Sequence, residues 1–352
     1  MKYLFKILIL LFGTLSFSQE LIFENLFDSS LSSEIACYRI PSIITSTNGT
    51  LIAAIDERNN SCGDLKWNKN INIVLRKSYD DGKTWTKIER IIDYPIGESA
   101  SDPSMIVDRQ TKDIFLFYNY MNLDKAKDIY RFMVIKSNDN GESWSSPKDI
   151  TDQITKKEWK NDFMFITSGR GIQSEDGILL HCLVNLNKGT HVFGSNDHGK
   201  NWFLIDYPLK PGDESKIIEL SNGDWLVNSR VNSNKFRYSH ISKDRGKSWL
   251  SFENKDLSDP ACNASIINYN ISSEKLLLFS NAFDSNERKN LSLSISYDQG
   301  MSWKNNKTIY KGSSAYSSMT KLKNGDIGLF FEKDNYTKNV FVRVPKKWLL
   351  DK

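Results

Sequence analysis

Apolar and polar residues alternate in short strand-like runs along much of this chain, as in Ile71–Lys77 and Phe132–Lys136. Signals for helices are nearly absent, and Tyr, Phe, Trp, Ile and Ser, which suit short half-buried strands, are common. Asx-Gly pairs separate several of the apolar segments, as two-residue hairpin turns do. These pairs are Asn48-Gly49, Asp176-Gly177, Asn222-Gly223 and Asn324-Gly325. The pattern predicts an all-β chain built from hairpins.

One eight-residue pattern occurs five times, each time after a strand-like run. It places Ser, Asp, Gly and Trp at fixed positions, and its Asp residues follow one another at intervals of 47 to 59 residues. Ser and Asp side chains can accept hydrogen bonds from backbone amides in a tight turn, and Gly supplies positive φ. The Trp is expected to return to the core as an apolar anchor. The copies are Ser78–Trp85, Ser137–Trp144, Ser195–Trp202, Ser242–Trp249 and Ser296–Trp303. Such spacing predicts a radial or stacked repeat.

The pattern S-x-D-x-G-x-T/S-W resembles the Asp-box of sialidases and their relatives. That resemblance implies a six-bladed β-propeller in which five blades carry a recognisable box. Asp-boxes lie at the periphery of propellers with many functions, so the box by itself indicates architecture and not chemistry.

The chain of 352 residues has no linker or break in composition, which predicts one domain over residues 19–352. The resemblance implies that this domain is a catalytic propeller. Residues 1–18 resemble a signal peptide, with Lys2 and Lys6 before an apolar segment that is too short to cross a membrane. A secreted or periplasmic protein, cleaved near Ser18 and monomeric, is expected. Loss of two lysines from the 47 Lys+Arg leaves 45 against 43 Asp+Glu, so nothing in the charge favours nucleic acid or membrane partners.

The cysteines and histidines are few and lack the spacing of metal ligands, so neither a metal nor a cofactor is expected. Export would permit a disulfide, and Cys37 and Cys62 lie near two strands of the expected site. Buried free thiols remain the alternative for these two residues and for Cys182 and Cys262.

Three arginines match positions that clamp the carboxylate of sialic acid in sialidases. Tyr38-Arg39-Ile40-Pro41 matches the Y/F-R-I-P motif, and the hairpin from Glu214 to Arg230 resembles the segment with the second arginine. Arg288 is the third by resemblance, with a surface ion pair beside Glu287 as its alternative. Guanidinium groups match the geometry of a carboxylate better than ammonium groups. The segment that ends at Glu332 resembles the one whose glutamate holds the first arginine.

The nucleophile is expected to be Tyr316, because Ser314-Ala315-Tyr316-Ser317 resembles the A-Y-S segment of the family. Sialic acid carries its carboxylate on the anomeric carbon, so an anionic Asp or Glu nucleophile would be repelled. A neutral phenol avoids that repulsion if a base removes its proton, and sialidases are a known exception to the two-carboxylate rule for glycosidases. The resemblance makes Glu214 the base.

The general acid is expected on the loop that follows Ala53–Asp56. Asp64 is preferred, and Asp56 is the competing carboxylate, which could instead orient Arg58. Arg58 matches an arginine of the family that reaches the neighbourhood of the carboxylate or the 4-hydroxyl of the sugar. Asp102 resembles a further pocket residue near that hydroxyl, although it could simply be a turn residue before Pro103. Candidates for the acetamido pocket are Tyr118, Tyr120 and Met121.

These resemblances imply an exported, retaining exo-α-sialidase that acts on sialylated glycans. A trans-sialidase or an intramolecular trans-sialidase would use the same core residues. A non-catalytic sialic acid-binding propeller would be expected to lack Tyr316, Glu214 or Asp64, which are all present. Structural or sorting propellers form another class, but they would not need three placed arginines.

Overall fold

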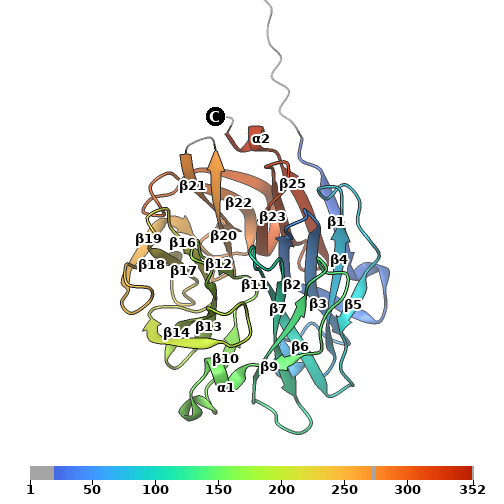
Figure 1. Ribbon diagram of the computed structural model, residues 1–352. Coiled ribbons are helices and arrows are strands. Elements are labelled where there is room, and N and C mark those ends of the chain that lie inside the picture. The colour runs from blue at the N-terminus through green and yellow to red at the C-terminus, as the bar shows by residue number, and fades with distance from the viewer. Residues whose placement is uncertain (1–19, 272–273, 351–352) are drawn as a thin grey trace, which may run out of the picture.

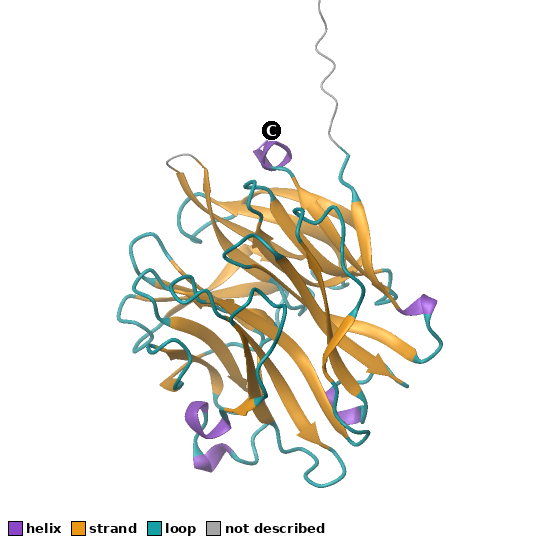
Figure 2. Ribbon diagram, turned by 45° about the vertical axis from the view of Figure 1, so that its right-hand side comes forward, coloured by secondary structure: helices purple, strands orange, loops and turns teal. Residues whose placement is uncertain are grey.

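The computed structural model describes residues 20–271 and 274–350, so the expected signal peptide lies outside the described residues. Strands dominate the chain, and the few helices are short and lie at the periphery (Figure 2). The sheets are grouped around a centre in a propeller-like arrangement (Figure 1). The predicted all-β class is therefore confirmed. No helix in the described ranges has the length and apolar character needed to cross a membrane.

The strands of the described residues form five sheets. The first contains β2 (Ile35–Thr45), β3 (Leu51–Asn59), β4 (Ile71–Ser78) and β5 (Glu89–Ile92). The second contains β6 (Glu98–Val107), β7 (Ile114–Asn122), β8 (Arg131–Ser137) and β9 (Lys148–Asp149), with β11 (Gly169–Arg170) parallel to β6. The third contains β10 (Met164–Ile166), β12 (Ile172–Gln173), β13 (Leu179–Asn185), β14 (Gly189–Ser195) and β15 (Phe203–Leu209). The fourth contains β16 (Ser215–Glu219), β17 (Trp225–Ser229), β18 (Phe236–Ser242) and β19 (Leu250–Ser258).

The fifth sheet is larger because one long strand belongs to two groups of strands. It contains β20 (Ser265–Ile271), β21 (Glu274–Ala282), β22 (Lys289–Ser296), β23 (Lys304–Lys321), β24 (Ile327–Lys333), β25 (Lys338–Val344) and β1 (Phe23–Asp28). The first part of β23 pairs with β22 and the second part pairs with β24. β1 pairs with β25, so the beginning of the described chain completes a sheet formed by its end.

The helical segments are single turns or little more. They are α1 (Thr151–Ile154), α2 (Lys346–Leu350) and the 3-10 turns Ser29–Leu31, Leu65–Trp67 and Lys157–Trp159.

The five repeated turns share one set of hydrogen bonds. In the first turn the Gly82 amide donates to Ser78 Oγ over 2.9 Å, and the Thr84 amide donates to Asp80 Oδ1 over 2.9 Å. The same pairs recur in the other four turns. Each turn thus satisfies its own backbone, as the residue types predicted.

The tryptophans of these turns are not equivalent, which corrects the expectation that all of them anchor the core. Trp202 and Trp303 are buried, at 5% and 6% exposure, whereas Trp85, Trp144 and Trp249 are only partly buried. Trp202 packs in an aromatic cluster with Phe115, Phe117 and Phe193, at ring distances of 5.0 to 5.9 Å. The burial of the repeat tryptophan therefore differs from one turn to the next.

The strands nearest the middle of the molecule position the site. β2 lies against β6 on one side and β23 on the other, and β16 lies against β20. In Figure 1, β11, β16 and β20 lie nearer the middle than β5 and β19, which lie on opposite sides. Side chains at one end of these inner strands can therefore meet across the centre.

Candidate active site

Glu332 on β24 holds the first predicted arginine. Its Oε1 accepts from Arg39 Nε over 2.6 Å and from the Ile40 amide over 2.9 Å, and its Oε2 accepts from the Tyr316 amide over 3.0 Å. The pairing of β2 with β3 shifts register after Arg39, and Ile40 has a φ of 68°. This irregularity turns the Ile40 amide toward the carboxylate. Glu332 is fully buried, and its cost of burial is offset because both oxygens are bonded.

The phenol of Tyr316 lies among all three predicted arginines. The Cζ atoms of Arg39 and Arg288 are each 5.4 Å from the centre of its ring, and Arg230 Nη1 donates to its hydroxyl over 3.1 Å. Burial, followed by the charge of Glu214, raises the pKa of Tyr316 well above its ordinary value, although the arginines act to lower it. The phenol is therefore protonated at neutral pH and needs a base before it can attack.

Glu214 and Arg230 face each other because they flank the hairpin of β16 and β17. The Arg230 amide donates to the Glu214 carbonyl over 3.0 Å, and Arg230 Nη1 donates to Glu214 Oε2 over 2.6 Å. The hydroxyl of Tyr316 and the carboxylate of Glu214 thus bond to the same nitrogen. Arg230 Nε is held by Asn232 Oδ1 at 2.7 Å. Burial works to lower the pKa of Arg230, but the charges of Glu214 and other neighbouring groups, with the hydrogen bond to Glu214, together raise it.

Arg288 reaches the site and does not form the alternative surface pair. Its Nη1 donates to Tyr336 Oη over 3.2 Å and its Nη2 to the Ala261 carbonyl over 3.0 Å. Glu287 instead bonds to Lys289 Nζ at 2.6 Å.

Tyr336 is a site residue that the sequence reasoning missed. Its ring centre lies 4.1 Å from Arg39 Cζ, and its hydroxyl accepts from Arg288. It ends a turn in which three successive residues, Asp334 to Tyr336, have positive φ. Such a turn is rare for residues other than glycine, and the sequence carries no glycine there to signal it.

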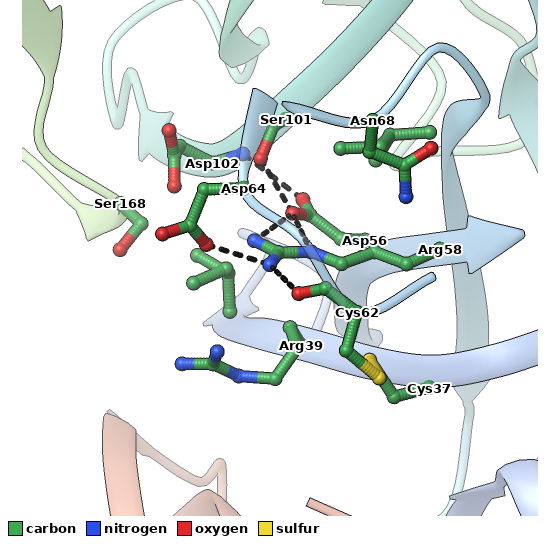
Figure 3. Close-up of polar contacts among 12 residues, drawn as sticks. Cys37, Arg39, Asp56, Arg58, Cys62, Asp64, Asn68, Ser101, Asp102 and Ser168 are labelled. Carbon is green, nitrogen blue, oxygen red and sulfur yellow. Dashed lines mark hydrogen bonds and ion pairs between the residues drawn. A yellow bond between two sulfur atoms is a disulfide. The ribbon is translucent and has the colours of Figure 1, made fainter. Parts of the chain in front are cut away.

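The guanidinium group of Arg58 bonds to both of the competing carboxylates, Asp56 and Asp64 (Figure 3). Its Nη2 donates to Asp56 Oδ2 over 3.0 Å, and its Nη1 donates to Asp64 Oδ1 over 2.7 Å. Asp56 is fully buried and also accepts from Ser101 Oγ and the Asp102 amide, whereas the side chain of Asp64 is 66% exposed. Only Asp64 is open to an incoming ligand, so the geometry favours it over Asp56.

Asp64 and Asp102, which lie near Arg58 and Asp56, differ in the direction in which their pKa is shifted. Burial works to raise the pKa of Asp64, but the charge and hydrogen bond of Arg58 outweigh it and hold the pKa below its usual range. Burial, and then the charge of Asp56, raise the pKa of Asp102 to about 8. Asp102 also has a φ of 64° and accepts from Asn119 Nδ2 over 2.9 Å. With this pKa the carboxyl group is mostly protonated at neutral pH, and its part in a sugar pocket stays a prediction.

A disulfide joins Cys37 on β2 to Cys62 on the loop that carries Asp64, which settles the alternatives left open by the sequence. Arg58 Nη1 also donates to the Cys62 carbonyl over 2.9 Å (Figure 3). Cys182 and Cys262 are buried free thiols.

The three candidates for an acetamido pocket do not join the arginine cluster. Tyr118 Oη pairs with Tyr94 Oη at 2.8 Å, and Tyr120 Oη donates to Glu98 Oε2 over 2.7 Å. Met121 is fully buried in an apolar cluster. Tyr118 and Met121 are thus core residues, and their part in a pocket stays a prediction.

The arrangement as a whole suits an anionic sugar. Three guanidinium groups surround a buried phenol, a buried glutamate lies beside it, and an exposed aspartate lies on a neighbouring loop. Guanidinium groups match carboxylates by geometry and charge. A phenol, a glutamate and an aspartate are side chains of the types that can act as a nucleophile, a base and an acid.

Comparison with known proteins points the same way. A family model described as a BNR repeat-like domain matches residues 49–329. A sialidase from Bacteroides fragilis (strain YCH46) is 29% identical over 330 residues, covering 84% of this chain and 60% of the relative. A sialidase from Micromonospora viridifaciens is 32% identical over 327 residues, covering 84% of this chain and 50% of the relative. This chain therefore spans only about half to three fifths of these relatives. The solved Hadza microbial sialidase Hz136 superposes with a TM-score of 0.80 at 26% identity, covering 88% of this chain and 66% of that one.

Proposed function

Because the chain belongs to the sialidase family of BNR repeat-like proteins, we propose that it is a retaining exo-α-sialidase that releases terminal sialic acids from glycans. The observation that carries the proposal is the position of Tyr316 among three guanidinium groups, next to Glu214. A structural propeller has no need for buried arginines around a phenol. We assign Arg39, Arg230 and Arg288 to the sialic acid carboxylate, with Glu332 orienting the first of them.

In the proposed first step, the oxygen of Tyr316 bonds to the anomeric carbon while the glycosidic carbon–oxygen bond breaks. Glu214 takes the phenol proton, and Asp64 gives a proton to the departing oxygen. In the second step Asp64 takes a proton from water, the water oxygen displaces Tyr316, and the phenol recovers its proton from Glu214. Two displacements at one carbon restore its configuration.

The lowered pKa of Asp64 sets a condition on this mechanism. In the unliganded site Asp64 is ionised and paired with Arg58. A bound sugar would cover the exposed carboxylate, and removal from water favours the protonated form. We propose that ligand binding in this way prepares Asp64 as the acid. We assign Arg58 and Asp102 to the hydroxyl groups of the sugar.

We also propose that the molecule is a six-bladed propeller with five Asp-boxes in one domain. The two partners of β23 support six blades, because splitting β23 divides the largest sheet into two groups of four strands. The shared hydrogen bonds of the five turns support the Asp-box assignment. Export after cleavage near Ser18 and a monomeric state complete the proposal.

Product analysis tests the reaction and separates it from its rivals. With sialyllactose isomers as substrates, we expect free sialic acid by mass and its α-anomer first in an NMR time course. An intramolecular transferase would instead release a product lighter by one water, and a trans-sialidase would extend an added acceptor. Absence of all three products would contradict the proposed reaction and favour a non-catalytic propeller.

Replacement of the nucleophile tests the covalent step. Tyr316→Phe should abolish nearly all turnover while sialic acid binding persists, because the arginines that hold the carboxylate remain. A fluorinated sialosyl fluoride that traps the intermediate should label Tyr316 in the unmodified protein and leave the variant unlabelled. Initial formation of β-sialic acid would show direct attack by water and would exclude Tyr316 as the nucleophile.

A further inference from the structure

A cavity of about 940 Å³ opens at the end of the inner strands that is opposite to Tyr316. On β2, Arg39 belongs to the site while Thr45 lines this cavity, and on β23 Tyr316 and Lys321 are separated in the same way. Five or six residues of strand separate the two places, which corresponds to roughly 15–20 Å. We call this cavity of about 940 Å³ the axial cavity. Its size is in the range of pockets that hold small ligands.

Arg170 presents an unsatisfied cation to the axial cavity. Its Nη1 donates to the Met319 carbonyl over 3.0 Å, but its buried Nε has no acceptor among the described residues. Arg170 is only partly buried and lines the cavity. Burial lowers the pKa of Arg170 to about 10, and no carboxylate offsets that effect. The group still carries its charge at neutral pH, and an uncompensated buried charge is costly.

The other charged residues around the axial cavity also favour an anion. Its lining contains five basic residues and two acidic ones, namely Arg109, Arg170, Lys275, Lys321, Lys323, Glu175 and Glu219. Both acids have contacts within the wall, because Glu219 accepts from the Glu175 amide and Glu175 lies 3.9 Å from Arg109. Within the described part of the chain, none of the three lysines forms an ion pair with a carboxylate. They are exposed at the mouth and can attract a charged ligand.

We propose that the axial cavity binds a small organic anion with a carboxylate or phosphate group, which Arg170 holds at the inner end. Either group would accept hydrogen bonds from the accessible part of the Arg170 guanidinium and would neutralise its charge, whereas Nε itself is enclosed by protein. Exposed hydroxyl and amide side chains in the wall, among them Thr47, Ser221 and Asn270, offer partners for a polar ligand of sugar size. This site is separate from the arginine cluster around Tyr316 and does not depend on the reaction proposed for it.

Calorimetric titration of the purified protein with citrate and with inorganic phosphate tests the proposal. Arg170→Leu should weaken binding of the preferred anion roughly tenfold or more, because a charged hydrogen-bonding partner is lost. Arg288→Leu is the matched control, since it removes the same kind of side chain from the other arginine cluster and should leave this binding intact. Tighter binding of citrate would identify a carboxylate ligand, and tighter binding of phosphate a phosphorylated one. Galactose, which is neutral, should not bind.

The outcomes separate the two anion sites. A loss of binding in Arg288→Leu with none in Arg170→Leu would place the anion at the Tyr316 site and overturn the proposal. Equal affinity in all three proteins, or no binding of either anion at millimolar concentration, would also overturn it. Arg170→Leu removes an unpaired buried charge, so we expect it to fold, and thermal denaturation checks this. Lys321→Met at the mouth is a second variant and should weaken binding with a smaller dependence on salt.

Discussion

Single carboxylates in this site bind several neighbours at once. Glu332 bonds to the Arg39 side chain and to the amides of Ile40 and Tyr316, so it fixes a proposed carboxylate-binding residue and the backbone of the proposed nucleophile together. Removal of such a carboxylate would leave a buried guanidinium and two amides without their acceptor. The geometry of the site therefore depends on one side chain that bonds to two strands, β2 and β23, which are far apart in the sequence.

Asp64 can be tested through the leaving group of the substrate. Asp64→Asn should reduce turnover of natural sialosides far more than turnover of aryl sialosides, because an acidic phenol departs with little protonation. Steady-state kcat/KM for sialyllactose and for an aryl sialoside measures the difference. Asp56→Asn is the control, and its buried position predicts similar losses on both substrates. Equal losses for Asp64→Asn would mean that Asp64 positions the ligand instead of protonating it.

The raised pKa of Asp102 predicts that activity depends on pH. Its pKa of about 8 lies above the ordinary value because of burial and the charge of Asp56, so it is neutral below pH 8 and ionised above it. Ionisation adds a negative charge near Asp56 and Asp64, against an anionic substrate. We expect kcat/KM to fall as the pH rises through about 8. Asp102→Asn should remove that decline or move it to higher pH. An unchanged profile in the variant would assign the decline to another group.

The sequence could predict those residues of the site that sit in compact motifs. Arg39, Tyr316 and Glu332 are each marked by their immediate neighbours in the chain, and the structure brings them together. Tyr336 carries no such mark, because its position depends on a turn of positive φ that packs it against Arg39. Arg170 was missed for a similar reason, since its lack of a carboxylate partner is a property of the folded molecule.

At the scale of elements, each repeated turn satisfies its own backbone, but its tryptophan depends on the neighbouring sheet. Trp202 contacts phenylalanines of β7 and β14, whereas Trp85 is only partly buried and packs on Phe341 at 5.1 Å. The pattern therefore predicts the turn and cannot predict the burial, which is decided by residues more than a hundred positions away in the case of Phe341.

This difference predicts unequal losses of stability. Trp202→Ala should lower the free energy of unfolding by about 3–5 kcal/mol, as expected for a large-to-small change in a packed core. Trp85→Ala, in the same position of another repeat, should cost less because less surface is buried there. Urea denaturation at one temperature and pH compares both variants with the parent. Equal losses would show that the turn, and not the packing of the ring, determines the contribution.

At the scale of the whole molecule, the ring is completed by strands from its two ends. β1 pairs with β25, and β25 continues through β24 to β23, which carries Tyr316. Neither β1 nor β25 contains a motif that predicts their pairing. The sequence therefore predicted a repeating domain without indicating which strands pair at its two ends. The closure matters for the candidate site because β24, two strands from β1 in the same sheet, carries Glu332, which bonds to Arg39.

Phe27 on β1 tests whether this closure stabilises the molecule. Its ring is 1% exposed and lies 5.3 Å from Tyr38 and 5.9 Å from Phe330, between centroids, so it joins β1 to both β2 and β24. Phe27→Ala should lower the free energy of unfolding by about 3–5 kcal/mol. Phe23→Ala on the same strand is the control and should cost less, since Phe23 is 37% exposed. Urea denaturation followed by tryptophan fluorescence measures both. If Phe27→Ala unfolds at the same urea concentration as the parent, β1 is an accessory strand and the ring is held closed by its other sheets.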